Sequence, residues 1–476
     1  MNLLSVGLEL VSLHVLGFIA ACHAIMHART SQGAIAWAVA LVSVPYVTLV
    51  PYLFLGSSRF AGYVDEHRFN RARAQARRAA GDAAMRIVAA ARRYAAQEPA
   101  LHRFLAVEGL VGRHFLGGNR VALLKDGRAT FDAIFQAIAA ARHYVIVQFF
   151  IVRNDDLGRE LQRALLDAVG RGVGVYFLYD RIGSHALDRR YIDTLRAAGV
   201  QIHAFAIRRF RNRFQLNFRN HRKIVSVDGQ CAFIGGHNVG VEYLGARAPL
   251  SPWRDTHIRI EGPAVVQVER TFSEDWYWVT QRLPDVREPV STPGDMCCLA
   301  VPSGPADAQE TCSLFFVQAI HAARHRIWLS SPYFVPDSAV RAALRLAALR
   351  GVDVRVLIPC RPDHFTVFQA SAYHAYEAVR TGVKVYRYQP GFLHQKALLI
   401  DDDAAAVGSA NLDNRSFRLN FELMLLVASP AFAADVEAML RADFEQAELV
   451  PADEYEQVSM PRRIVMHYAR LFAPIL

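Results

Sequence analysis

The stretch NHRKIVSVDG at residues 220–229 has a counterpart later in the chain, LHQKALLIDD at residues 393–402. Each stretch contains a His, a Lys two residues later, and an Asp five residues after the Lys. The 476-residue chain has 54 Lys and Arg residues, and only four of them are Lys. Two of the four, Lys223 and Lys396, stand in these stretches. Because the chain otherwise uses arginine for positive charge, the two lysines indicate a chemical requirement at equivalent places of a duplicated unit.

The sequence before each stretch repeats one order of predicted secondary structure. Apolar, β-branched runs alternate with segments whose leucines recur at helical spacing, as Leu157, Leu161 and Leu165 do. In each half the order is strand, helix, strand, helix, strand: residues 144–152, 156–172, 173–180, 187–198 and 200–205, and then 326–335, 337–351, 352–359, 371–381 and 383–388. This alternation predicts an α/β fold with a mixed sheet in each half. We expect domains at 109–290 and 291–476, with the Pro-rich residues 284–305 as the seam.

Residues 1–58 are predicted to form a transmembrane helical hairpin. Residues 3–25 and 33–56 are largely apolar, and each run is long enough to cross ~30 Å of hydrocarbon at ~1.5 Å per residue. We expect Pro45 and Pro51 to bend or shorten the second helix. A cleaved signal peptide is disfavoured, because no basic residue precedes Leu3 and a second apolar run follows at once.

Arginines on either side of the second apolar run predict the orientation of the hairpin. The connection before it holds Arg29, whereas a cluster follows it: Arg59, Arg68, Arg71, Arg73, Arg77 and Arg78. The positive-inside rule therefore predicts that both chain ends and the large domains lie in the cytoplasm. Residues 59–108 are expected to be a basic juxtamembrane helical linker, whose arginines either contact anionic headgroups or remain in solvent.

The composition narrows the class of partner. A net charge of +10 and a pI of about 9.4 predict an anionic partner, either a membrane surface or nucleic acid. A basic stretch directly before the first motif is expected to attract anionic headgroups: Arg208, Arg209, Arg211, Arg213 and Arg219. The six cysteines form no C-x-x-C pair and show no zinc-ligand spacing. We therefore expect core cysteines, no metal site and no cofactor.

The His and Lys of each motif are suited to phosphate chemistry. Side chains two residues apart on a strand point to the same face, so each His is expected beside its Lys. An ammonium neutralises phosphate oxygens, and an imidazole serves near neutral pH as nucleophile or as acid and base. If the two motifs face each other across a pseudo-two-fold axis, His221 and His394 would lie on opposite sides of one phosphorus. By the same alternation Asp228 and Asp401 face away, which predicts a structural turn at each.

Two further pairs of residues follow the motifs. A Gly-rich turn and an Asn come after each one, in AFIGGHN and AAVGSAN, so Asn238 and Asn411 are predicted to bind phosphate. Further on lie Asp255 in WRDTHIRIEG and Glu422 in RLNFELML. A nucleophilic imidazole needs its second nitrogen held by a carboxylate or a carbonyl. We expect Asp255 and Glu422 to hold one His each.

The two motifs resemble those of the phospholipase D superfamily. A wider set of segments resembles the bacterial cardiolipin synthases within it: NFRNHRKIVSVDG, NVGVEYLG, WRDTHIRIEGPAV, FLHQKALLIDD, GSANLDNRSFRLNFE and RLFAPIL, together with the N-terminal hairpin. The resemblance covers nearly the whole chain. It implies two phospholipase D-like domains related by pseudo-two-fold symmetry, preceded by the hairpin and forming one site between them. It also implies a metal-independent phosphohistidine mechanism in which the motif residues are catalytic, namely His221, Lys223, Asp228, His394, Lys396 and Asp401.

The resemblance also implies an activity and its partners. The reaction would transfer a phosphatidyl group from one phosphatidylglycerol to another, with His221 as nucleophile and His394 as acid. The implied partners are anionic phospholipids, phosphatidylglycerol and cardiolipin, at the inner membrane of a bacterium; no cofactor and no nucleic acid is implied. Phosphatidylethanolamine stays open as the alternative second substrate, and the sequence indicates no oligomeric state.

Two other classes of function share some of these features. A nuclease or phosphodiesterase of the same superfamily would use the same residues, but two membrane spans argue against a nucleic-acid substrate. A lipid-binding scaffold without activity would explain the spans and the basic charge but not the duplicated His and Lys. Lipid turnover with and without His221 distinguishes an enzyme from a scaffold.

Overall fold

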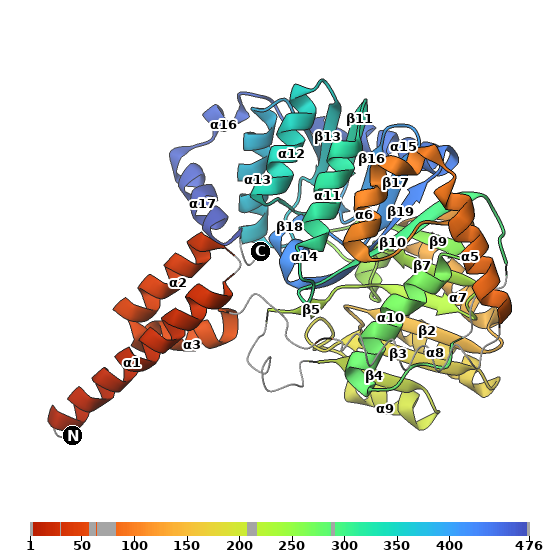
Figure 1. The fold of residues 1–476 in the computed structure, drawn as a ribbon, viewed down its shortest axis with the longest axis horizontal. Coiled ribbons are helices and arrows are strands. Elements are labelled where there is room, and N and C mark those ends of the chain that lie inside the picture. The colour runs from red at the N-terminus through yellow and green to blue at the C-terminus, as the bar shows by residue number, and fades with distance from the viewer. Residues whose placement is uncertain are drawn as a thin grey trace. The chain divides into compact units, whose positions relative to one another are not determined.

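A computed structural model describes residues 3–28, 30–56, 63, 82–206, 217–286 and 291–473. The arginines that predict the hairpin's orientation, at 29 and 59–78, lie outside the described residues, as do those of the basic stretch at 208–213. The chain forms two compact units (Figure 1). The N-terminal unit consists of residues 1–63 with 206–218 and 305–308, and the second unit holds the remaining residues.

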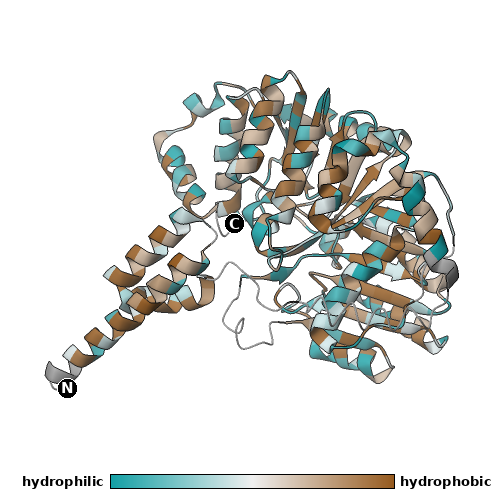
Figure 2. Cartoon of the chain, in the orientation of Figure 1, coloured by the Kyte–Doolittle hydropathy of each residue, from teal (hydrophilic) through white to brown (hydrophobic). Residues whose placement is uncertain are grey.

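The N-terminal unit contains three apolar helices, α1 (Leu3–His27), α2 (Ser31–Ser43) and α3 (Pro45–Leu55). Figure 2 shows predominantly hydrophobic residues along all three. The backbones of α1 and α2 approach closely at Gly17, where an added Cβ would lie 2.3 Å from the carbonyl oxygen of Leu41. Of the described helices, one is long and apolar enough to cross a membrane, over Gly7–His27.

The second apolar run is divided at a proline, as the sequence indicates. Helix α2 ends at Ser43, and Pro45 is the first residue of α3. Proline has no backbone N–H to continue the hydrogen bonds of α2, but it is tolerated in the first turn of a new helix. Pro51 lies inside α3 without ending it.

The second unit is built around a 16-stranded mixed sheet. Its strands are β1 (Leu116–Lys125), β2 (Tyr144–Phe149), β3 (Gly174–Asp180), β4 (Gln201–Phe205), β5 (Arg219–Asn220), β6 (Ile224–Val227), β7 (Cys231–Gly235), β9 (Thr256–Glu261), β10 (Met296–Ser303), β11 (Arg326–Ser330), β13 (Asp353–Pro359), β14 (Lys384–Tyr388), β16 (Ala397–Ile400), β17 (Ala404–Gly408), β19 (Asn420–Ala428) and β20 (Ala447–Leu449). Two small two-stranded sheets accompany it: β8 (Trp253–Arg254) with β15 (Phe392–Leu393), and β12 (Phe334–Val335) with β18 (Leu412–Asp413).

The strand order shows the duplication. The first half runs β1-β9-β7-β6-β2-β3-β4, and the second runs β10-β19-β17-β16-β11-β13-β14 before β20 ends the sheet. In each half the last three strands of this series are parallel and the others antiparallel. Antiparallel pairing of β1 with β10 joins the halves into one sheet. The predicted pair of mixed-sheet α/β domains is confirmed, and β10 lies within the Pro-rich seam.

Helices accompany the sheet, and most of them bury an apolar stripe against it or against one another. They are α5 (Asp82–Ala96), α6 (Leu105–Val111), α7 (Asp126–Ala140), α8 (Asp156–Gly170), α9 (Arg189–Ala197), α10 (Val265–Thr280), α11 (Thr311–Ala322), α12 (Ser338–Leu349), α13 (Phe365–Val379), α14 (Asn414–Arg418), α15 (Pro430–Glu445), α16 (Glu454–Gln457) and α17 (Met460–Leu471), with short 3₁₀ helices η1 (Pro99–Phe104) and η3 (Val241–Leu244). In α8, Asp155 accepts a hydrogen bond from the Gly158 N–H at the N-terminus, and Leu157, Leu161 and Leu165 are buried.

Part of the expected linker at 59–108 belongs to the second unit. From Asp82 onward this segment forms α5, η1 and the start of α6. Leu101, Phe104 and Val107 are buried in the hydrophobic core of the second half. Their burial explains why this stretch folds with the domains, because apolar side chains recurring at three-residue spacing need a surface to cover them.

Candidate functional site

The two motifs lie at equivalent places, each between a two-residue strand and a four-residue strand. His221 follows β5 and precedes β6, and His394 follows β15 and precedes β16. The residues from His to Lys are therefore in a short irregular link, and the prediction that they lie on a strand is wrong. The side chains of His221 and Lys223 nevertheless both pack against the ring of Phe150.

Each motif is held by the opposite half of the unit. Strand β5 pairs in parallel with β19, and the backbone N–H of His221 donates to the carbonyl of Phe421 at 2.9 Å. Strand β15 pairs in parallel with β8, and the N–H of His394 donates to the carbonyl of Arg254 at 2.7 Å. The short strand before each motif thus lies beside the segment of the other half that carries a carboxylate. Strand β5 lies beside the segment with Glu422, and β15 lies beside the segment with Asp255.

Both imidazoles are hydrogen-bonded to a carboxylate from the other half. His221 Nδ1 lies 3.0 Å from Glu422 Oε2, and His394 Nδ1 lies 2.6 Å from Asp255 Oδ2. A proton on Nδ1 would donate to the carboxylate and leave Nε2 with a free lone pair. Burial lowers the pKa of His221 to about 4 and that of His394 to about 3, more than the carboxylates raise them. Near neutral pH both rings in the empty site are therefore uncharged and available as bases or nucleophiles.

The two carboxylates stay ionised in different surroundings. Burial alone would raise the pKa of Glu422, but the hydrogen bonds from His221 and Ser409 and the nearby Lys223 ammonium together lower it. Glu422 also accepts hydrogen bonds from Ser409 Oγ at 2.6 Å, Ser416 Oγ at 2.9 Å and Asn420 Nδ2 at 3.2 Å.

Asp255 accepts its hydrogen bonds from fixed N–H donors. Its Oδ1 accepts from the backbone N–H of Thr256 at 2.8 Å, and its Oδ2 accepts from Trp253 Nε1 at 3.4 Å and from His394. Burial opposes ionisation, yet the hydrogen bond from His394 and the charge of Lys396 help to hold the pKa of Asp255 far below its usual range. The Gly-rich turn contributes here, because a Cβ at Gly236 would lie 2.0 Å from Asp255 Oδ1.

Both motif lysines are buried behind the histidines. Lys223 Nζ donates to the carbonyl of its own motif's His221 at 2.6 Å, and Lys396 Nζ donates likewise to the carbonyl of His394. Burial lowers the pKa of both ammonium groups, that of Lys396 to about 8 and that of Lys223 well below its usual value. An ammonium has three donors, so each lysine retains the capacity to bind a further acceptor.

A cavity of about 870 Å³ brings the two halves of the site together. His221, His394, Asn238 and Asn411 all line it. Aromatic rings hold the imidazoles, with Phe150 centred 5.0 Å from His221 and Trp253 centred 5.0 Å from His394. The remaining lining combines apolar and basic side chains, among them Ile151, Ile182, Leu250, Val367, Arg153, Arg219, Arg247 and Arg415, with three acidic residues, Glu242, Asp363 and Asp413. A wall of this composition fits an amphipathic molecule with an anionic group.

The two asparagines are placed differently within this cavity. Asn238 is fixed at both ends of its amide, since Oδ1 accepts from the Ile151 N–H at 3.1 Å and Nδ2 donates to the Tyr243 hydroxyl at 2.9 Å. Asn411 Nδ2 donates to Asp413 Oδ2 at 3.2 Å. Burial raises the pKa of Asp413 to about 6.

The structure does not bring the motif aspartates to the site. Asp228 accepts hydrogen bonds from the backbone N–H groups of Arg142, His143 and Tyr144, each at 2.8 Å. Asp401 accepts equivalent bonds from residues 324–326. Both aspartates have positive φ, 54° and 51°, which residues in tight turns adopt. Their prediction as structural turns is confirmed, and their assignment as catalytic residues is wrong.

Sequence reasoning missed two buried ion pairs that support the histidines. Arg222 NH1 lies 2.8 Å from Asp275 Oδ1 on α10, and its Nε donates to the carbonyl of Glu422 at 3.0 Å. Arg254 binds Asp443 on α15 with two hydrogen bonds of 2.8 and 3.0 Å. The second pair, and the contact of Arg222 with Glu422, connect the two halves. A signal was present, because the two aspartates lie on equivalent helices, α10 after β9 and α15 after β19, but acidic residues on a helix usually face solvent.

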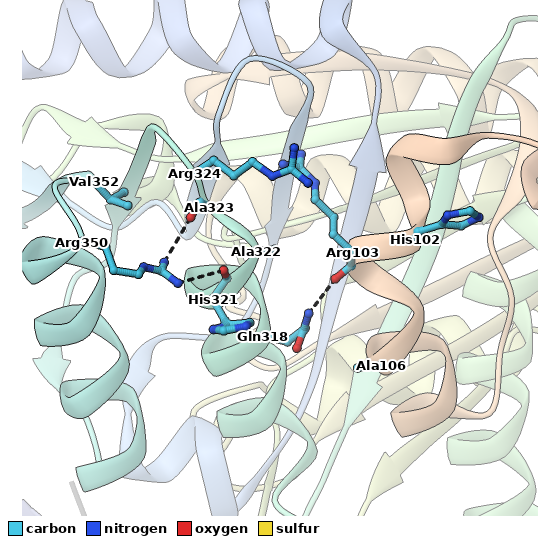
Figure 3. A pocket seen from close by; sticks show the side chains of 10 residues that line it. All are labelled: His102, Arg103, Ala106, Gln318, His321, Ala322, Ala323, Arg324, Arg350 and Val352. Atoms are coloured by element: carbon cyan, nitrogen blue, oxygen red, sulfur yellow. Dashed lines mark hydrogen bonds between the residues drawn. The ribbon is translucent and has the colours of Figure 1, made fainter.

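A second cavity, of about 650 Å³, lies away from these residues. Figure 3 shows its lining, which includes Arg103, Arg324 and Arg350 but none of the motif residues. Arg350 there donates to the carbonyls of Ile320 and Ala323, at the end of α11. Within the described part of the chain, no group of three or more His, Cys, Asp or Glu side chains is arranged to hold a metal ion.

Fold and site together define a duplicated α/β protein with a two-histidine site of the phospholipase D type. The family model described as "Cardiolipin synthase, PLD-like domain" matches residues 134–276 and 316–444. Cardiolipin synthase A of Pseudomonas aeruginosa (strain LESB58) is 55% identical over 473 residues, covering 99% of this chain and 96% of the relative. Cardiolipin synthase A of Pseudomonas fluorescens is 53% identical over 472 residues, covering 99% of this chain and 98% of the relative. The chain therefore belongs to the cardiolipin synthase family of phospholipase D-like phosphatidyltransferases.

A solved structure supports the fold. The phosphatidylserine synthase of Haemophilus influenzae Rd KW20 superposes with a TM-score of 0.61 at 14% identity, covering 79% of this chain and 100% of that chain. At this identity the likeness concerns the fold alone.

Proposed function

We propose that this phosphatidyltransferase moves the phosphatidyl group of one phosphatidylglycerol to a second phosphatidylglycerol, forming cardiolipin and releasing glycerol. The observation that carries the proposal is the pair of imidazoles on one cavity, each with Nδ1 on a carboxylate and Nε2 free. A nucleophile and an acid at one phosphorus are what a two-step displacement requires.

In the first step His221 Nε2 attacks phosphorus. A nitrogen–phosphorus bond forms and the bond from phosphorus to the glycerol oxygen breaks, while His394 gives a proton to that oxygen. The bound phosphate carries a negative charge beside His394, which raises the pKa of this imidazole above its value in the empty site and lets it hold the proton. The two imidazoles occupy equivalent positions in the duplicated fold, so their positions do not identify the nucleophile. The choice of His221 follows the family resemblance.

In the second step a hydroxyl of the second phosphatidylglycerol replaces the first glycerol. His394 takes the hydroxyl proton, the new oxygen–phosphorus bond forms and the bond to His221 breaks. Lys223, Lys396, Asn238 and Asn411 hold the phosphate oxygens in both steps. Their charge and donors surround the place where negative charge develops, which lowers the barrier without a metal ion.

The N-terminal unit is proposed to be a two-pass anchor in the inner membrane, with the catalytic domains on the cytoplasmic side. The apolar length of α1 and of α2 with α3, and the arginines that follow them in sequence, support this arrangement. An anchor concentrates the acceptor lipid around the site, which favours transfer over hydrolysis by water at about 55 M.

Product analysis of the full-length protein in phosphatidylglycerol vesicles tests the proposal. Cardiolipin and free glycerol are expected in near-equal amounts, with phosphatidic acid as a minor product. If phosphatidic acid dominates, the protein is a hydrolase and the proposal fails. A parallel arm with added phosphatidylethanolamine measures released ethanolamine, which identifies that lipid as a phosphatidyl donor.

A further inference from the structure

The last described helix, α17, carries an apolar stripe that faces away from its own unit. Met466 and Ala469 are buried, and α17 packs beside α13 (Figure 1). Four apolar residues recur at helical spacing on the outer face and are 50–66% exposed: Met460, Ile464, Tyr468 and Leu471. Phe472, which follows the helix, is 51% exposed. A helix on a soluble surface normally turns its polar face outward, so an outward apolar stripe indicates a binding partner.

Basic side chains flank this stripe. Helix α17 contains three arginines and a histidine, Arg462, Arg463, Arg470 and His467, and no acidic residue. The guanidinium of Arg470 is held over the ring of Tyr373, and it donates to the Tyr373 hydroxyl at 2.7 Å. Arg463 Nε donates to the carbonyl of Val458 at 2.9 Å. The Tyr373 hydroxyl and the Val458 carbonyl carry no negative charge, so these hydrogen bonds do not neutralise the two arginines beside the stripe.

The stripe lies next to the entrance of the catalytic cavity. Ala469 of α17 is buried in one cluster with Val335 and Ala370, and Val367 packs against the same cluster. Val367 also lines the catalytic cavity, together with His364. Between these two residues, Phe365 begins α13 with 65% of its surface exposed. Helix α17 therefore packs, through its buried face, on the segment that carries Phe365 and the Val367 wall of the cavity.

We propose that α17 and Phe365 form a docking surface that lies in the headgroup layer of a bilayer containing anionic phospholipid, and so opens the catalytic cavity to lipid. An enzyme that transfers phosphatidyl groups must take lipid from a bilayer into its cavity. The choice of a bilayer as the partner of this surface therefore rests on the proposed function. An apolar stripe with basic flanks is the pattern of helices that lie at anionic membrane interfaces. A second copy fits less well, because a two-fold contact through this face would oppose two basic flanks.

A fluorescent label tests docking directly. In full-length protein with Cys22→Ser and Cys360→Ser, an environment-sensitive dye is attached at Leu471→Cys, and the protein is placed in phosphatidylglycerol nanodiscs. Leu349→Cys on α12 is the matched control, since Leu349 is as exposed as Leu471, at 69% against 65%. We expect quencher-labelled lipids to quench the dye at 471 several-fold more than the dye at 349. Equal quenching, or shielding of the dye at 471 by a second copy without lipid quenching, overturns the proposal.

Turnover tests the consequence of docking. The variant Tyr468→Asp/Leu471→Asp is compared with Leu346→Asp/Leu349→Asp, which places the same charges on the exposed apolar side of α12. On phosphatidylglycerol bilayers the first variant is expected to lose about tenfold or more in rate and the second to stay near wild type. On short-chain phosphatidylglycerol dissolved as monomers, both are expected to keep the wild-type rate.

The two assays distinguish a failure of membrane docking from a failure of the proposed function. An unchanged bilayer rate in the α17 variant, or an equal loss on bilayers and monomers, overturns docking. If the unmodified protein converts neither form of the lipid, the proposed function fails, and the dye at 471 still decides whether the surface meets a bilayer.

Discussion

Asp255→Asn is expected to cost far more activity than Glu422→Gln, although both changes neutralise an equivalent carboxylate. The reason lies in the donors around each group. Every neighbour of Asp255 is a fixed N–H: the backbone of Thr256 on one oxygen, and Trp253 with His394 on the other. An amide at this position must point its NH₂ group at one of these donors. If it points at His394, it favours the tautomer with the proton on Nε2, which cannot accept a proton from the attacking hydroxyl.

Glu422 lies among donors that can adapt. Two of them are the hydroxyls of Ser409 and Ser416, which can rotate and accept instead of donate. The third is the amide of Asn420, whose oxygen is buried and makes no hydrogen bond to any described residue. A flip of this amide would accept the new NH₂ of Glu422→Gln, so that the remaining oxygen still receives the proton of His221.

The expected losses follow from these environments. Glu422→Gln loses the charge on one hydrogen bond, worth about 1.5–3 kcal/mol, or about 10- to 150-fold in rate. Asp255→Asn also favours the tautomer of His394 that carries its proton on Nε2. The comparable change in a serine-protease triad costs about 10⁴-fold in kcat. We therefore expect the Asp255 variant to be slower than the Glu422 variant by about tenfold or more.

The assay is initial cardiolipin formation in phosphatidylglycerol vesicles at saturating lipid. Far-UV and near-UV circular dichroism of both variants establishes that each is folded. Equal losses, or a larger loss in Glu422→Gln, would refute the argument from donor adaptability.

Other predictions concern single features of the site. His221→Ala and His394→Ala are each expected to abolish turnover in folded protein, and activity above about a tenth of wild type in either would exclude a two-histidine mechanism. Lys396, whose pKa burial lowers to about 8, is charged below that pH in the free protein, so kcat/KM should fall as the pH rises through about 8, and Lys396→Arg should lower the rate because a guanidinium places its donors differently; a kcat/KM that stays constant from about pH 7 to about pH 9 would contradict this. Asp228→Ala and Asp401→Ala should lower the melting temperature by several degrees while kcat per folded molecule stays near wild type. A large loss of kcat in folded protein would indicate a catalytic role for these aspartates. EDTA should leave turnover unchanged, and loss that one specific metal restores would contradict the proposed mechanism.

The sequence predicts those parts of the fold that depend on local pattern. The helix at 156–172 and the strand at 173–180 appear as α8 and β3 within two residues at each end, because their apolar periodicity agrees with their packing. The placement of His221 and Lys223 within a strand failed for a non-local reason. A two-residue strand, β5, pairs with the other half just before them, and nothing local marks a pairing of that length.

The same limit applies to the partners of the histidines. Spacing and residue type identify Asp255 and Glu422 as candidates, but they do not determine which His each one meets. That assignment depends on β8 pairing with β15 and on β5 pairing with β19, contacts between residues more than a hundred positions apart. The buried roles of Asp275 and Asp443 escape detection for the same reason, because burial of one helix face against a distant segment is invisible in the helix's own sequence.

The exchange of carboxylates between the halves also determines when, during protein synthesis, the chain can first act. A ribosome completes His221 and Asp255 well before it reaches His394 and Glu422. Until then the first imidazole has no carboxylate, and the first carboxylate would be buried without the imidazole that holds its charge, which is costly. Under the proposed two-histidine mechanism, a nascent chain therefore stays inactive until the second half has been made and has folded against the first.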